Sequence, residues 1–200
     1  MDSDLINKKL KFLDEIEKFS CIKRKILKSN GECESDSDHS WFLAMFVMIF
    51  KDEILNSNSN LDYTRMLEMC LIHDLPEVYA GDVFPFGEGF NKVAKEKSDK
   101  YAADELFNLL DEPLKSKFIN LYKEYSEIKS PEAEVVKALD KIQPDHLNVL
   151  LKGENWKFHN ITFTKLFDYK DKYISKNVFT KSLYYDFIIK KGLDEGFLKK

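Results

Sequence analysis

The sequence predicts an all-α protein, a compact bundle of several helices. Apolar residues recur at the three- and four-residue spacing of helices, and no run alternates apolar and polar residues as half-buried strands do. Only seven glycines and five prolines interrupt 200 residues, so we expect long helices with few breaks. The length fits one domain, and 44% hydrophobic residues suffice to bury a core.

The first half of the chain is expected to form three helices separated by polar loops. Residues 4–20 have an amphipathic helical pattern, and residues 28–38 form a polar loop. The segment WFLAMFVMIF (41–50) is apolar on all sides, which is typical of a central buried helix. Residues 62–75 form another apolar helix, which Pro76 is expected to end or bend.

The second half begins with the longest irregular segment, residues 76–91, and long ordered loops often carry functional sites. The segment SPEAEVVKALDKI (130–142) starts a helix with strong signals, because its serine can cap the first turn and its proline suits the first helical position. The other helices are expected over residues 92–110, 113–128, 162–175 and 178–191.

Composition excludes several classes of protein. The net charge is −4 and no block of basic residues is present, so a general nucleic-acid surface is not expected. No apolar run is long enough to cross a membrane, and the N-terminal residues lack the apolar core of a signal peptide. The three cysteines are widely spaced and form no C-x-x-C pair, which favours the cytoplasm over an oxidising compartment.

Two of the four histidines occupy unusual positions. His39 opens the most apolar helix, and His73 closes another apolar helix with Asp74 directly after it. A histidine and a carboxylate at a buried helix end are costly unless they are paired or bind a metal, and this donor set suits Mn, Fe, Co or Ni. The alternatives are a chance His-Asp pair, a capping histidine at position 39 and, for Asp140, a place on the helix surface between two lysines.

Three separated segments carry a family resemblance. ESDSDHSWFLA (34–44), LIHDLPEVYAGD (71–82) and SPEAEVVKALDKI (130–142) resemble, in this order, the corresponding segments of the HD-domain superfamily of metal-dependent phosphohydrolases, and among them the 5′-deoxynucleotidases. The resemblance covers about residues 10–150 and implies a single helical domain of HD type over 1–200. Residues 151–200 are then a C-terminal helical extension packed on that core.

The resemblance also implies roles for individual residues. The metal ligands would be His39, His73, Asp74 and Asp140, drawn from three helices as a site in a bundle core requires. No histidine lies between His73 and Asp140, which indicates one divalent ion (Mn, Co, Fe, Ni or Mg). Four protein ligands leave about two of six octahedral positions for water and a phosphate oxygen.

Three further residues match the catalytic and binding positions of the family. Glu77 and Asp82 correspond to two catalytic acids. Alternatively, Glu77 is a solvated acid in a loop and Asp82 is part of a plain Gly-Asp turn. Arg24 corresponds to a phosphate-binding arginine, and its fork of donors suits a phosphate dianion; the alternative is a solvated basic turn. Lys25 departs from the family, which has an aromatic residue near this arginine that helps to sense the sugar.

The resemblance implies a phosphomonoesterase that removes the 5′-phosphate of deoxynucleoside monophosphates, and the ligand set is consistent with its metal dependence. The substrate class follows from the resemblance alone, because a fold does not determine a substrate. The alternatives are a phosphodiesterase or phosphohydrolase of another phosphorylated metabolite, a non-catalytic metal- and nucleotide-binding sensor, and a helical interaction module. The resemblance also suggests a homodimer, with a small-molecule nucleotide as the ligand and neither nucleic acid nor membrane as partner.

Overall fold

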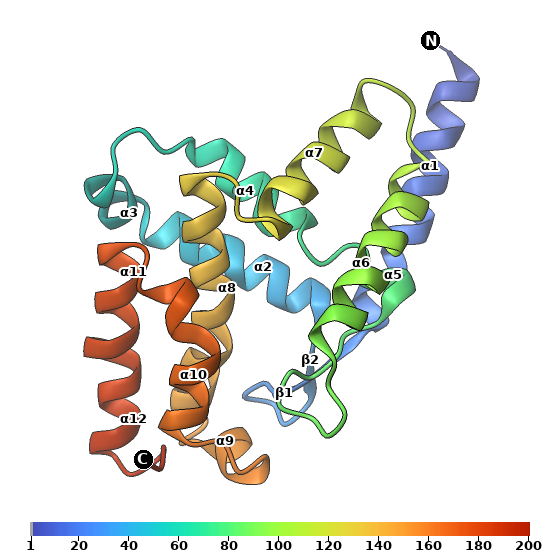
Figure 1. Ribbon diagram of the computed structural model, residues 1–200. Coiled ribbons are helices and arrows are strands. Elements are labelled where there is room, and N and C mark those ends of the chain that lie inside the picture. Colours follow the sequence, from blue (N-terminus) through green and yellow to red (C-terminus); the bar gives the residue numbers. More distant parts are fainter. Residues whose placement is uncertain (1) are drawn as a thin grey trace.

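The structure is a computed structural model that describes residues 2–200, and it confirms the predicted all-α fold (Figure 1). Two of its helical elements depart from α geometry, η1 being a 3₁₀ helix and η2 a π-helix. The helices are, in order, α1 (Ser3–Glu17), η1 (Lys18–Cys21), α2 (Asp36–Ile49), α3 (Lys51–Ser57), α4 (Tyr63–Ile72), α5 (Glu77–Ala80), α6 (Lys92–Phe107), α7 (Leu114–Ser126), α8 (Pro131–Leu150), α9 (Glu154–Phe158), α10 (Phe163–Ile174), α11 (Val178–Ser182), η2 (Leu183–Ile189) and α12 (Lys190–Asp194).

A short β-hairpin corrects the expectation that the chain has no strands. Strand β1 (Lys23–Leu27) pairs antiparallel with β2 (Cys33–Ser35), which lies inside the predicted 28–38 loop. Gly31 adopts a φ of 82° at the turn, a conformation that favours glycine. Strands of five and three residues are too short to show an alternating pattern. The hairpin matters for function because β1 carries Arg24 and β2 leads directly into α2.

Helix α2 begins five residues earlier than the apolar run predicted. Ser35 and Asp38 form a reciprocal capping box: the Asp38 backbone N–H donates to Ser35 Oγ (3.1 Å), and the Ser35 N–H donates to Asp38 Oδ2 (3.0 Å). The helix is not buried on all sides, since Trp41 and Ile49 are 62% and 69% exposed. The early start places His39 in the first turn of the helix.

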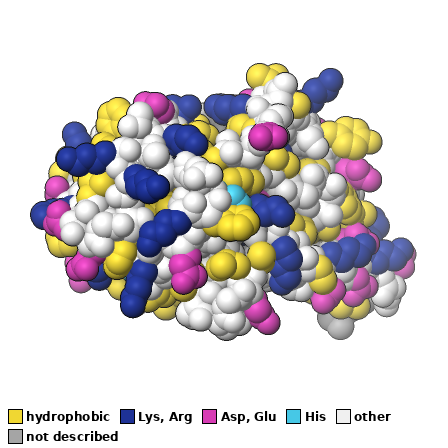
Figure 2. All heavy atoms as spheres, turned by 90° about the horizontal axis from the view of Figure 1, so that it is seen from below, with side chains coloured by type: hydrophobic (Ala, Val, Ile, Leu, Met, Phe, Trp, Pro, Cys, Tyr) yellow, Lys and Arg dark blue, Asp and Glu magenta, His cyan; other side chains and the backbone are white. Residues whose placement is uncertain are grey.

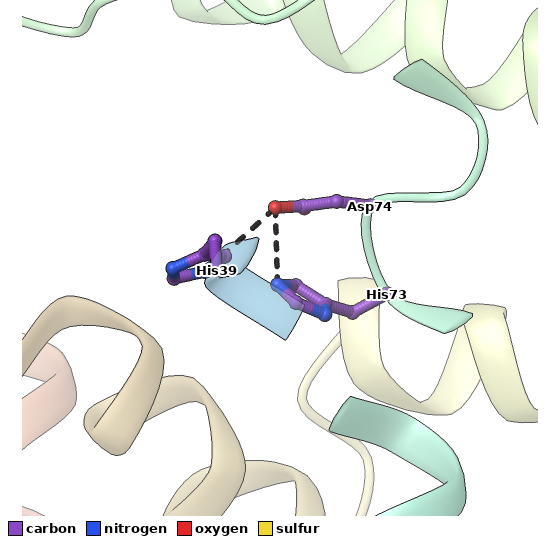
Figure 3. A group of neighbouring side chains, drawn as sticks. All are labelled: His39, His73 and Asp74. Carbon is purple, nitrogen blue, oxygen red and sulfur yellow. Dashed lines mark ion pairs between the residues drawn. The ribbon is translucent and has the colours of Figure 1, made fainter. Parts of the chain in front are cut away.

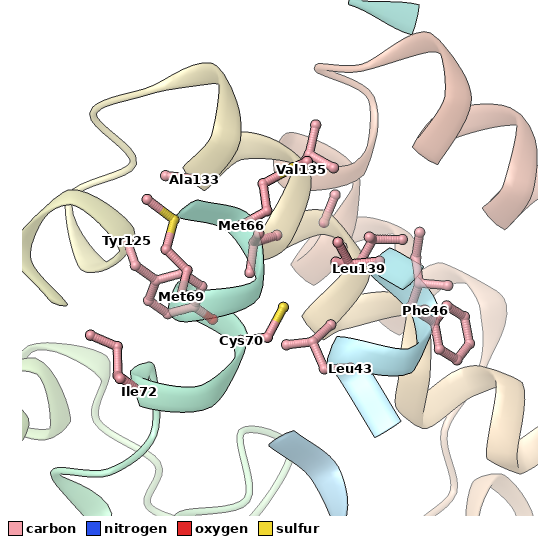
Figure 4. Close-up of a cluster of buried hydrophobic side chains, with 14 of the residues drawn as sticks. Leu43, Phe46, Met66, Met69, Cys70, Ile72, Tyr125, Ala133, Val135 and Leu139 are labelled. Carbon is pink, nitrogen blue, oxygen red and sulfur yellow. The ribbon is translucent and has the colours of Figure 1, made fainter. Parts of the chain in front are cut away.

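The central core lies between α2, α4 and α8 (Figures 1 and 4). Leu43 of α2, Met66 and Cys70 of α4, and Leu139 of α8 are fully buried and belong to this core, on which the rigid placement of the site depends. Helix α8 continues through Pro144 to Leu150, although this proline has no N–H to donate to the backbone carbonyl four residues earlier.

The C-terminal helices are attached to α8 through one buried carboxylate, Asp145. Lys170 of α10 pairs with Asp145 Oδ2 at 2.6 Å, and Tyr184 of η2 donates its hydroxyl to the same oxygen at 2.7 Å. The indole Nε1–H of Trp156, in the unpredicted helix α9, donates to Oδ1 at 3.2 Å. Three separate elements therefore converge on a single side chain of the core helix.

Among the described residues, no helix combines the length and the apolar composition that a bilayer crossing needs.

Candidate metal centre and active site

Three helical segments bring the four predicted metal ligands together. His39 lies in the first turn of α2, His73 directly follows α4, and Asp140 lies in the middle of α8. His39 Nε2 is 3.2 Å from Asp140 Oδ1 and 3.9 Å from Asp74 Oδ2, while His73 Nε2 is 3.0 Å from Asp74 Oδ2. Figure 3 shows His39, His73 and Asp74 pointing toward one another, so residues far apart in sequence form one donor cluster.

The protein fixes the orientation of both imidazole rings. His73 Nδ1 lies 2.9 Å from the Cys70 carbonyl oxygen, which can only accept, so Nδ1 carries the proton. His39 Nδ1 lies 2.9 Å from Gln143 Oε1. The orientation of the Gln143 amide is fixed because its Nε2–H donates to Glu34 Oε1 at 2.7 Å, so Oε1 is the atom that accepts from His39 Nδ1–H. Both rings therefore present Nε2 to the cluster, the usual arrangement of metal-ligating histidines.

The donor set fits a divalent cation. His39 and His73 are 0% and 3% exposed, and within residues 2–200 His73 Nε2 finds no hydrogen-bond partner, although a carboxylate oxygen lies 3.0 Å away. A buried nitrogen without a partner is costly, and a cation between this nitrogen and the carboxylates would satisfy it. Burial opposes ionisation of Asp74, yet His73 and Arg24 outweigh it and hold the pKa of Asp74 far below its usual range.

A second group of acids adjoins this cluster. Carboxylate oxygens of Asp36, Glu77 and Asp82 lie within 4.8 Å of one another. Burial and the charge of Asp74 raise the pKa of Glu77 well above its usual range and that of Asp36 to about 7, and burial raises the pKa of Asp82. The structure thus brings both predicted catalytic acids to the site and adds Asp36, which the sequence analysis missed by placing residue 36 in a loop.

Glu77 itself is held by a lysine that the sequence analysis did not single out. Lys95 of α6 lies 2.8 Å from Glu77 Oε1 and 2.5 Å from Asp99 Oδ1. The other oxygen, Glu77 Oε2, is buried and has no partner among the described residues. The carboxyl is therefore anchored through one oxygen and leaves the second free for proton transfer.

Arg24 reaches the cluster from strand β1. Its Nη1 lies 3.1 Å from Asp74 Oδ2 and 3.4 Å from Asp36 Oδ1, and its Nε lies 3.4 Å from Glu34 Oε2. The side chain is only 15% exposed, which rules out the solvated basic turn. Its guanidinium is the cation that bridges the His-Asp cluster and the second group of acids.

Two lysines of α8 turn toward the site rather than toward solvent. Lys141 Nζ lies 3.0 Å from Asp140 Oδ2, and Lys137 Nζ lies 3.9 Å from the same oxygen and 4.0 Å from the centre of the Tyr125 ring. Burial and the charge of Lys141 lower the pKa of Lys137 to about 8. Asp140 is 3% exposed, so the alternative of a surface aspartate between solvated lysines is wrong.

The cluster lies in a cavity of about 780 Å³. His73, Asp74, Glu77, Asp82 and Arg24 all line it. The cavity is large enough for a small-molecule ligand of nucleotide size. The site therefore combines a metal-type donor cluster, acids with raised pKa values and a cation, all of which face the same space.

Comparisons with known proteins identify the family of this chain. The model of the HD domain family matches residues 16–181. The 5′-deoxynucleotidase HDDC2 of Danio rerio is 34% identical over 110 residues, which cover 55% of this chain and 52% of that protein. The protein of the same name from Homo sapiens is 33% identical over 110 residues, which cover 55% of this chain and 50% of that protein. The chain thus spans about half the length of these two relatives. The Dictyostelium discoideum 5′-deoxynucleotidase HDDC2 is 30% identical over 172 residues, 73% of this chain and 90% of that protein.

Two solved structures share the fold. A predicted metal-dependent phosphohydrolase from Magnetospirillum magnetotacticum MS-1 superimposes with a TM-score of 0.87 at 25% identity, covering 98% of this chain and 99% of that one. A protein from Pyrococcus horikoshii OT3 has a TM-score of 0.64 at 23% identity, covering 92% and 98%. The family match over residues 16–181, a range that includes the His-Asp cluster, shows that this chain belongs to the HD-domain family.

Proposed function

We propose that this protein is a metal-dependent phosphomonoesterase that removes the 5′-phosphate from deoxynucleoside monophosphates. The observation that carries the proposal is a pair of buried histidines whose Nδ1 atoms are hydrogen-bonded to the protein and whose Nε2 atoms face Asp140 and Asp74. The names of the HDDC2 relatives, which are 5′-deoxynucleotidases, support the substrate class.

We propose a single divalent ion, Mn, Co, Fe, Ni or Mg, with His39, His73, Asp74 and Asp140 as its ligands. A bound ion would supply charge to polarise the phosphoryl group and to make a nearby water more acidic. The ring orientations set by Gln143 and by the Cys70 carbonyl keep the ligand nitrogens in place before any ion arrives.

Glu77 is proposed as the group that moves a proton. Because Lys95 holds Oε1, the unpaired Oε2 is the atom that faces the chemistry. A carboxyl whose pKa is raised toward the working pH can take a proton from the attacking water and return one to the leaving oxygen. Asp82 has a carboxylate oxygen within 4.8 Å of one of Glu77, and its pKa is also raised. We propose that it assists the leaving group.

Arg24 is proposed to bind the phosphate. A phosphate monoester brings nearly two negative charges into a site with several carboxylates, so a cation that can donate two parallel hydrogen bonds is needed. The guanidinium lines the cavity beside Asp74 and is placed to meet the phosphate there.

The proposal is tested by phosphate release from deoxynucleoside monophosphates with Mn, Co, Mg and Ni in turn, on wild type and Arg24 variants. Arg24→Ala is expected to weaken kcat/KM for the monoester by about 2–4 kcal/mol in transition-state terms, with Arg24→Lys in between because it keeps the charge and loses the fork. A diester such as bis-p-nitrophenyl phosphate carries less negative charge, so Arg24→Ala should lower its kcat/KM by a smaller factor.

The other arginine provides a matched control. Arg65 pairs with Glu124 on α7, so Arg65→Ala should leave hydrolysis near wild type. Equal losses on monoester and diester with Arg24→Ala would favour a phosphodiesterase. Tight nucleotide binding without phosphate release under every metal would favour a sensor.

We further propose that the whole chain is one domain, that it works in the cytoplasm and that it forms a homodimer. Helices after residue 150 share the hydrophobic core with those before it, which supports one domain. All three thiols are unpaired, which supports a reducing compartment.

The homodimer is supported by exposed Trp41 and Ile49 on α2, which supply apolar surface of the kind found at protein interfaces. Sedimentation equilibrium should give twice the chain mass of 23.5 kDa, and the monomer mass would contradict the dimer.

A further inference from the structure

The cavity has a second lining that the proposed chemistry does not use, made of aromatic rings. Phe84, His159 and Tyr169, which we call the aromatic wall, all line the same cavity as the His-Asp cluster. The ring centres of Phe84 and His159 are 4.5 Å apart. Phe86 links the wall, with its ring centre 5.7 Å from that of Phe84 and 5.3 Å from that of Tyr169. The wall is therefore one packed group of rings.

The wall is assembled from segments that are far apart in sequence. Phe84 belongs to the irregular loop after α5, His159 directly follows α9, and Tyr169 lies on α10. The sequence analysis gave the C-terminal aromatics no functional role. The structure instead places four aromatic residues of this C-terminal part at the cavity, two of which, His159 and Tyr169, belong to the wall. All three wall residues keep part of their surface exposed.

Two chain connections place the wall beside the phosphate end of the cavity. Phe84 follows the acid Asp82 by two residues, and both side chains line the cavity. On the other side, strand β1 is tied to helix α9 because the Leu27 N–H donates to Asn155 Oδ1 at 3.1 Å. The wall thus lies next to the acids on one side and next to the strand that carries Arg24 on the other.

The chemistry of the wall suits a flat aromatic ligand group. Exposed ring faces favour stacking on another π system, and they do so with little regard to its hydrogen-bonding pattern. Figure 2 shows one histidine side chain at the surface of the lower face, among hydrophobic side chains and next to a Lys or Arg. Burial lowers the pKa of His159, which disfavours a positive charge on this ring of the wall.

We propose that the aromatic wall binds the base of the nucleotide by stacking, while Arg24 and the His-Asp cluster take its phosphate. This inference rests on the proposed nucleotidase function and names the part of the cavity that separates nucleotides from other phosphate monoesters. Because stacking is tolerant of base identity, the four deoxynucleoside monophosphates should have KM values that differ little, whereas 2-deoxyribose 5-phosphate, which lacks a base, should have a much higher KM.

Phe84→Leu is the sharpest test, since leucine keeps an apolar side chain and removes the ring. KM for deoxyadenosine monophosphate should rise about 5- to 100-fold with kcat near wild type, as expected for loss of a contact made equally in ground and transition states. Hydrolysis of 2-deoxyribose 5-phosphate should not change. The inhibition constant of deoxyadenosine, the product without phosphate, should rise by the same factor and reports binding without turnover.

Two variants serve as controls. Phe84→Tyr keeps the ring and should retain the wild-type KM. Phe187→Leu removes an aromatic side chain that is 67% exposed and outside the cavity, and it should change nothing. Thermal unfolding of each variant checks that the loop after α5 remains folded.

The possible failures are distinct. An unchanged KM for deoxyadenosine monophosphate in Phe84→Leu, or an equal rise for 2-deoxyribose 5-phosphate, would overturn the base contact. A wild-type enzyme with the same KM for both substrates would also overturn it while leaving the phosphomonoesterase intact. A wild-type protein that hydrolyses neither substrate with any of the four metals would overturn the proposed function, and the base contact with it.

Discussion

Replacing Glu77 with glutamine is expected to lower turnover about 10²–10⁴-fold, the usual effect of removing a positioned general acid or base. The amide keeps the shape of the side chain and can still accept a hydrogen bond from Lys95, but it cannot move a proton. Metal content should stay near wild type, because Glu77 is not one of the four proposed ligands. Phosphate release under single-turnover conditions and metal analysis of the same preparation measure both quantities.

Glu88→Gln is the matched control for this experiment, since Glu88 lies in the loop that follows α5, is exposed and does not line the cavity. It should have wild-type turnover. If Glu77→Gln also turned over at the wild-type rate, proton transfer would have to be assigned to Asp82 or to Asp36, the other acids of the group.

Asp145→Ala is expected to destabilise the protein by about 3–5 kcal/mol, because it leaves the buried Lys170 ammonium without its counter-ion. The Lys170 and Asp145 side chains are only 6% and 3% exposed, so the unpaired ammonium would be largely shielded from solvent. The substitution also removes the acceptor for the Tyr184 hydroxyl and the Trp156 indole. Urea unfolding followed by circular dichroism measures the loss.

A surface ion pair supplies the comparison. Glu134 pairs with Lys176 at 2.9 Å with both side chains well exposed, so Glu134→Ala should cost less than about 1 kcal/mol. In a single domain, Asp145→Ala should lower the midpoint of one cooperative transition. Loss of the C-terminal helices in a separate, earlier transition would contradict the proposal that the whole chain is one domain.

Much of the fold was predictable from local patterns. Helical spacing of apolar residues predicted the all-α class and most of the helices, and Ser130 and Pro131 marked the start of α8. The segments around His39, His73 and Asp140 predicted which side chains would meet. The structure brings His39, His73 and Asp74 together and places Asp140 beside His39, which is consistent with a metal site.

The parts that escaped prediction depend on contacts between distant segments. Lys95 reaches Glu77 across 18 residues, and Asp36 joins the site only because a capping box starts α2 early. His159 and Phe84 are 75 positions apart in the sequence and form the wall because α9 is tied to β1. The Ser35-x-x-Asp38 capping box is a local motif that the sequence analysis overlooked, whereas tertiary packing determines the Lys95–Glu77 and Phe84–His159 contacts.

Binding of Mn²⁺ to metal-free protein, followed by isothermal titration calorimetry, tests the central claim most directly. The account predicts about one ion per chain in wild type and in the control His159→Gln, whose ring lies in the aromatic wall and not in the His-Asp cluster. It predicts no measurable binding in His73→Ala, together with loss of the thermal stabilisation that the ion gives wild type. A His73→Ala variant that binds Mn²⁺ as tightly as wild type would contradict the assignment of the metal centre, and two ions per wild-type chain would contradict the single-ion site.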